Sequence, residues 1–127
     1  MSWWVWVGVA VLGGVALLGG IGAIARFVVD AVVGSRFAGN FPLGTFVVNI
    51  GGALALGLLA GLAVTGNALV LAGGATLGSY TTFSTWMLET HRLAEDGQAP
   101  TAVANVVASL AVGIGAAALG RLIGAHV

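Results

Sequence analysis

The residues with the greatest capacity for chemistry lie in one stretch, residues 78–86, which reads Gly-Ser-Tyr-Thr-Thr-Phe-Ser-Thr-Trp. Every residue after Gly78 carries a hydroxyl group or an aromatic ring, yet residues 37–88 contain no charged side chain. Glycine and paired threonines permit a break in a helix, and the freed carbonyls would need protein, water or an ion as a partner. Alternatively, the helix is intact and its hydroxyls bond back to the preceding turn. The spacing supports both interpretations equally.

Two aromatic side chains of this stretch, Phe83 and Trp86, are three residues apart and so share a helix face. Aromatic rings have a positive edge. Ring edges turned toward a pore would receive an anion without trapping it, and conduction needs such weak binding. Packing against lipid or a neighbouring helix is the commoner role of two such rings.

Polar side chains at helical spacing extend this pattern to the rest of the chain. Thr45 and Asn49 share a face, and Asn49 must find a partner because a carboxamide in hydrocarbon is costly. Its amide could donate to a partly dehydrated anion, although a contact between helices is the favoured role for this residue alone. Glu89 is expected to be a vestibule group or a partner for an arginine such as Arg26. Asn105 and Ser109 share a face in the last apolar run, where they would continue a polar track.

The composition indicates that lipid is the solvent around these residues. The chain is 59% hydrophobic and 6% charged, against roughly 25% charged residues in a soluble domain. A net charge of zero and the lack of lysine exclude nucleic acid as a partner. There is no cysteine, and no nucleophile-base pair or metal-ligand cluster is visible, so an enzyme is not expected.

The apolar runs predict an all-α membrane protein with four transmembrane helices in one domain, residues 1–127. A spanning helix needs about 20 apolar residues, and the runs place the helices near 4–31, 43–65, 69–92 and 99–122. An alternative for the first run is a cleaved signal peptide, but that run lacks a basic start and is too long. Small residues spaced four apart favour close helix packing and an oligomer; the pairs are Gly57 and Gly61, Gly74 and Gly78, and Gly120 and Gly124.

Three ordered motifs over nearly the whole chain resemble the small bacterial fluoride channels called Fluc or CrcB. They are residues 19–26, Gly-Gly-Ile-Gly-Ala-Ile-Ala-Arg; residues 44–49, Gly-Thr-Phe-Val-Val-Asn; and residues 78–86 followed by Glu89. The resemblance implies a third helix broken in mid-membrane and an antiparallel, dual-topology dimer with two pores. It also implies a structural sodium ion at the dimer centre, which is not transported and is held by the carbonyls of Gly78 and Thr81.

By the same resemblance, the chain would allow passive efflux of cytoplasmic fluoride across the cell membrane of a bacterium. Phe83 and Trp86 would line the fluoride path, Asn49 would donate at its entrance, and Thr82 and Ser109 would belong to the polar track. Arg26, Thr45 and Glu89 are further candidates. The family usually has phenylalanine at the position of Trp86, which bears on the width and rate of the pore, and an aromatic residue is expected near Asn105.

The sequence is also compatible with two other functions. A small proton-coupled multidrug exporter of four-helix subunits needs a membrane-embedded carboxylate, and Glu89 is the main candidate because Asp30 lies at the far end of the first helix. A non-conducting assembly protein would explain the glycines but not residues 81–85. Within the channel family, the sequence does not choose between a homodimer and a heterodimer with a paralogous subunit.

Overall fold

The computed structural model describes residues 1–127 and is helical throughout, with no strands. The elements are α1 (Trp3–Arg36), α2 (Leu43–Gly61), α3 (Gly66–Leu69), the π-helical stretch η1 (Val70–Leu77), α4 (Gly78–Tyr80), α5 (Ser84–Glu95) and α6 (Ala99–Ala125). Three of them, α1, α2 and α6, are long and apolar enough to cross a membrane. The segment between α2 and α6 is built from shorter pieces.

Helix α1 continues past its predicted end at residue 31 as far as Arg36. Asp30 does not end the helix, since a charged side chain at the edge of an apolar run leaves the backbone hydrogen bonds intact. The helix stops where Phe37 becomes extended, before Gly39 with its φ of 140° and before Pro42. At 1.5 Å per residue, α1 is about 51 Å long, which exceeds the roughly 30 Å of a bilayer core.

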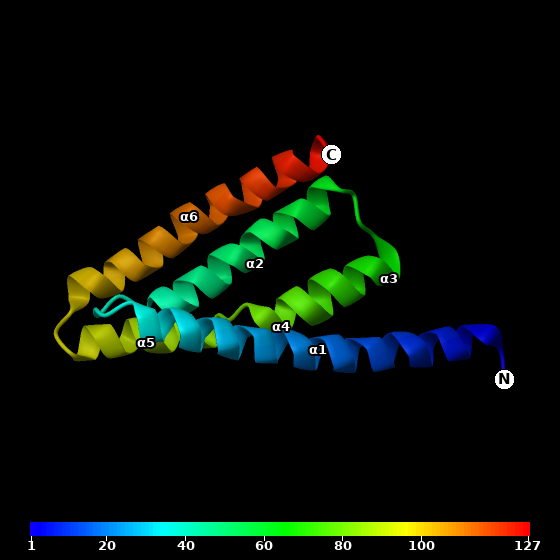
Figure 1. Ribbon diagram of the computed structural model, residues 1–127, viewed down its shortest axis with the longest axis horizontal. Coiled ribbons are helices and arrows are strands. Elements are labelled where there is room, and N and C mark those ends of the chain that lie inside the picture. The colour runs from blue at the N-terminus through cyan, green and yellow to red at the C-terminus, as the bar shows by residue number, and fades with distance from the viewer.

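The helices pack as two layers. Helices α2 and α6 lie side by side, and α1 runs along the segment formed by η1 and α4 (Figure 1). Helix α5 continues beyond α4 to the end of the bundle where α6 begins, and it contacts α6 (Figure 1). The interrupted segment therefore lies between α1 and α2, which positions the polar residues of its middle against both.

Glycine backbone makes the contact between α2 and α6 possible. A methyl group added at Gly57 would overlap the carbonyl oxygen of Ala117, and one added at Gly120 would overlap the carbonyl oxygen of Leu54. Gly61 and Gly124 are confined in the same way by opposing backbone. Two of the three predicted glycine pairs thus form a close helix contact.

The third predicted pair does not form such a contact within the chain. A methyl group added at Gly74 would have no neighbouring atom within 4 Å, and one added at Gly78 would meet only the Gly73 carbonyl oxygen, at 3.7 Å. Both residues are exposed. The prediction that this pair packs closely against another helix is therefore wrong for the single chain.

Candidate functional site

The helix break predicted in the third segment is confirmed, and it lies at residues 81–83. Thr81 ends α4 in an extended conformation, with φ −76° and ψ 160°, and α5 begins at Ser84. The stretch before the break is π-helical, and the Thr76 hydroxyl donates to the Leu71 carbonyl at 2.8 Å, five residues back. π-Helical stretches are rare and are frequently found at functional sites.

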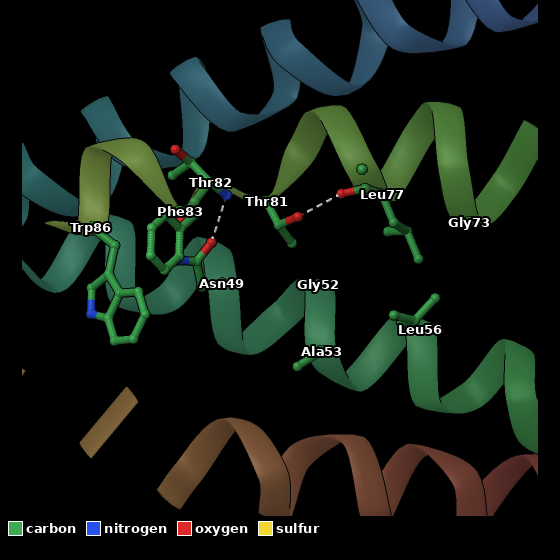
Figure 2. Close-up of a pocket in the computed structure, with 11 residues that line it drawn as sticks. Asn49, Gly52, Ala53, Leu56, Gly73, Leu77, Thr81, Thr82, Phe83 and Trp86 are labelled. Carbon is green, nitrogen blue, oxygen red and sulfur yellow. Dashed lines mark hydrogen bonds between the residues drawn. The ribbon is translucent and has the colours of Figure 1, made fainter. Parts of the chain in front are cut away.

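Asn49 replaces the helical hydrogen bonds that Thr82 loses at the break. Its Oδ1 accepts from the Thr82 N–H at 2.8 Å, and its Nδ2 donates to the Thr82 carbonyl, also at 2.8 Å. Figure 2 shows the Asn49 side chain pointing from α2 at the unwound backbone. Both main-chain groups of Thr82, which is half-buried, thereby have a hydrogen-bond partner.

The hydroxyl groups around the break also bond back along the chain. The Thr81 hydroxyl donates to the Leu77 carbonyl at 3.0 Å, and the Ser79 hydroxyl donates to the Ala75 carbonyl at 2.6 Å. The Thr82 hydroxyl accepts from the Thr85 N–H at 3.2 Å and so caps the start of α5. A broken helix and back-bonded hydroxyls, which the spacing presented as alternatives, are therefore both present.

Several carbonyl groups near the break have no donor from the helix, and those of Gly78, Ser79 and Thr81 are among them. The N–H groups that would reach the Gly78 carbonyl belong to Thr81 and Thr82, and these donate to Leu77 and Asn49 instead. The Thr81 carbonyl accepts no hydrogen bond within the chain. Free carbonyl oxygens are suitable ligands for a small hard cation.

An open central cavity of about 370 Å³ lies beside the break. Phe83 and Trp86 line it with their rings edge to face, at a centroid separation of 5.7 Å and an interplanar angle of 78°. Phe83 is 71% exposed in the single chain. The complete lining is Asn49, Gly52, Ala53, Leu56, Gly73, Leu77, Gly78, Thr81, Thr82, Phe83 and Trp86 (Figure 2).

A second cavity of about 340 Å³, here called the arginine cavity, lies on the other side of Thr82. Arg26 and Asp30 bring one charge of each sign to it, and Thr45, Thr82 and Thr85 bring hydroxyl groups. Thr82 lines both this cavity and the central cavity. It is the one candidate residue that connects the two spaces.

Glu89 is bound by Thr45 and not by Arg26. The Thr45 hydroxyl donates to Glu89 Oε1, and no arginine lies within salt-bridge distance of Glu89; the one histidine–carboxylate contact of the chain joins His91 and Glu95 on the surface, at 3.0 Å. The expected pairing of Glu89 with Arg26 is therefore not formed. Glu89 instead lines a third cavity of about 290 Å³ at the end of the bundle, together with Arg92 and Asp96.

Asn105 and Ser109 lie on α6, away from the two cavities beside the break. Asn105 is fully buried, and its Nδ2 donates to the Thr90 hydroxyl oxygen at 2.9 Å. Asn105 Oδ1 and Ser109 Oγ are buried without a hydrogen-bond partner. Sequence reasoning missed Thr90, although its position one turn after Trp86 was a signal for back-bonding.

The structure thus brings most of the candidate residues together. Asn49, Gly78, Thr81, Thr82, Phe83 and Trp86 line the central cavity, Arg26 and Thr45 line the arginine cavity, and Ser109 lines neither. With three long apolar helices and a broken segment between two of them, the chain is a multi-pass membrane protein.

Comparison with known proteins identifies the family. Residues 13–121 match the family model described as "CrcB-like protein, Camphor Resistance (CrcB)", and the chain belongs to this family. The predicted family membership is confirmed. The family is one of ion channels and not of enzymes.

Several similar proteins carry the name of a fluoride-specific ion channel. The chain is 56% identical over 117 residues to "Fluoride-specific ion channel FluC 2" of Mycolicibacterium paratuberculosis, with 92% of this chain and 91% of the relative covered. FluC 2 of Mycobacterium tuberculosis (strain ATCC 25618 / H37Rv) is 56% identical over 119 residues, with 94% and 90% covered. FluC 1 of Symbiobacterium thermophilum is 42% identical over 127 residues, with 95% and 96% covered.

Proposed function

We propose that this chain is a subunit of a fluoride-selective channel, through which cytoplasmic fluoride leaves a bacterial cell passively across the cell membrane. The observation that carries the proposal is the break at residues 81–83, which Asn49 stabilises and which sets Phe83 and Trp86 along one cavity. The names of relatives that match nearly the whole chain support the same function.

Donor groups near the two aromatic rings suit a small, strongly hydrated anion. Asn49 uses one of its two N–H bonds for Thr82, so the second can donate at the entrance of the path. The Thr82 hydroxyl accepts from Thr85 and keeps its own proton to donate. Ser109 has no partner within the chain, so its hydroxyl proton is also free for the polar track. Arg26 and Glu89 would set the charge at the two approaches, and Thr45 would hold the Glu89 carboxylate by its hydrogen bond.

The assembly proposed for the channel is an antiparallel, dual-topology dimer of four-helix subunits. The exposed side of Phe83 and the open central cavity face outward from the single chain, where a second chain would cover them. A homodimer and a pairing with a paralogous subunit are both compatible with this surface. Cysteine labelling at the termini in intact cells would detect both orientations for a homodimer and one for a paired paralogue.

A structural sodium ion at the dimer centre fits the free carbonyl groups of Gly78 and Thr81. Oxygen atoms are the ligands that such a cation prefers, and two chains would supply four of them. The bound ion would neutralise main-chain oxygens that otherwise repel each other across the interface.

Fluoride efflux from proteoliposomes tests the proposed function. We expect purified protein to release trapped fluoride and to retain chloride, without a proton gradient. Equal release of chloride would contradict the selectivity, and strict dependence on a proton gradient would favour a proton-coupled exporter. Phe83→Leu is expected to slow efflux about fivefold, as the loss of an aromatic contact of about 1 kcal/mol implies. Phe37→Leu, at an exposed ring outside the cavities, is the matched control.

Preparation of the protein without sodium tests the proposed ion. If sodium is kept at 100 times its Kd, its binding stabilises the dimer by about 2.7 kcal/mol. We therefore expect a lower dimer fraction, measured by light scattering in detergent, when N-methylglucamine replaces sodium from cell lysis onward, and recovery when sodium is restored. A dimer fraction that is the same in both buffers would rule out the sodium site.

A further inference from the structure

The Trp86 residue is held at both its side chain and its main chain. The indole Nε1–H donates to the main-chain oxygen of Asn105 at 3.4 Å, across the contact between α5 and α6. The main-chain oxygen of Trp86 accepts from the Thr90 hydroxyl at 2.8 Å. The ring itself lies edge to face with Phe83 on the central cavity.

The Asn105 side chain completes a closed circuit of three hydrogen bonds that joins Trp86, Thr90 and Asn105. The Thr90 hydroxyl donates its hydrogen bond to the Trp86 carbonyl, so the Thr90 oxygen can only accept from Asn105. Asn105 Nδ2 donates that hydrogen bond at 2.9 Å. The same requirement fixes the orientation of the amide. Asn105 Oδ1 is left buried without a partner, so this orientation is kept at a cost in free energy.

The consequence concerns the indole N–H, which is the strongest anion donor that the two aromatic residues offer. As long as it is bonded to the carbonyl of Asn105, the indole N–H is not available to an anion, and the two rings can offer only their carbon–hydrogen groups. A free indole N–H would bind a halide more tightly and delay its release, whereas conduction needs an anion to leave each site readily.

We propose that Asn105 and Thr90 are positioning residues that keep the Trp86 N–H turned away from the ion path and so hold anion binding there weak. The effect on ion flow rests on the proposed channel function. The effect on the indole group does not, and it can be measured separately.

Hydrogen exchange of the indole N–H tests the positioning directly. Substituting phenylalanine for Trp3, Trp4 and Trp6 leaves Trp86 as the only tryptophan, and its ¹⁵N-labelled indole resonance can be followed in D₂O. Asn105→Leu, which loses one hydrogen bond of about 1 kcal/mol, is expected to speed exchange about fivefold. Thr90→Val, which loses both hydrogen bonds of the hydroxyl, is expected to speed it at least as much. Thr90→Ser keeps the hydroxyl and should restore slow exchange, and Thr101→Val is the matched control.

The design separates loss of positioning from loss of folding. Asn105→Leu also removes the unpartnered Oδ1, so this variant should be at least as stable as the parent even if Thr90→Val is not. Unchanged indole exchange in the folded Asn105→Leu variant overturns the proposal.

Fluoride efflux then shows whether positioning affects conduction. In Asn105→Leu we expect the fluoride concentration for half-maximal efflux and the maximal rate both to fall about fivefold, whereas a merely structural role would lower the rate alone. Both effects should vanish in a Trp86→Phe background, which has no indole N–H. If the parent protein conducts no fluoride but indole exchange responds as expected, the result contradicts the proposed channel function and still supports the positioning role of Asn105 and Thr90.

Discussion

Asn49→Leu is expected to abolish fluoride efflux and to lower the free energy of unfolding by about 2–6 kcal/mol. The substitution keeps the volume of the side chain but removes both hydrogen bonds to Thr82. Each buried main-chain group left without a partner costs about 1–3 kcal/mol. With its N–H and carbonyl unpaired, Thr82 is expected to draw residues 81–83 back toward a helix and so to displace Phe83 from the cavity.

The measurement compares thermal unfolding in detergent with fluoride efflux from liposomes for the same preparations. Asn67→Leu is the control, because Asn67 lies in the short exposed helix α3 and its side chain makes no hydrogen bond. An Asn49→Leu protein with the parent's stability and efflux rate would mean that the break does not depend on the amide.

Gly57→Ala is expected to destabilise the chain by about 3 kcal/mol or more, and Gly120→Ala by a similar amount. Overpacking usually costs about 1–3 kcal/mol, and here the added methyl group meets opposing main-chain atoms that cannot rotate away. Helices α2 and α6 would have to separate along their whole contact. Thermal unfolding in detergent and the yield of membrane-inserted protein are the two measurements.

Gly115→Ala in α6 is the control, because it is not expected to destabilise the chain. Nothing lies within 4 Å of a methyl group at this position, and alanine is favoured over glycine inside a helix by about 1 kcal/mol. This variant should be as stable as the parent or slightly more stable. Equal losses in Gly57→Ala and Gly115→Ala would show that helix propensity, and not close approach, controls the packing of α2 and α6.

The sequence predicted the helical class, the region of the break and most of the residues around it. Charge-free apolar runs admit little besides helices, and the polar stretch at residues 78–86 was conspicuous within such a run. The close contact made by the two glycine pairs on α2 and α6 could also be predicted, since small residues four apart leave a groove on one helix face.

The partners of individual polar groups could not be predicted in this way. Thr82 and Asn49 are 33 residues apart, and periodicity gives the face of a helix but not the residue opposite it. The hydrogen bond between Asn105 and Thr90 could not be predicted for the same reason. Gly74 and Gly78 matched the packing pattern, yet they are exposed and meet no other helix within the chain. Residues 70–77 are π-helical, and no composition rule predicts where a helix widens its turn.

A subunit alone in a bilayer would present the Thr81 carbonyl and an exposed Phe83 ring to its surroundings. A main-chain oxygen facing acyl chains costs several kcal/mol, which is a substantial fraction of the stability of a whole domain. We therefore expect the solitary chain to be short-lived in the cell: insertion and encounter with a second copy would have to follow each other closely, and chains made in excess would be degraded by membrane proteases.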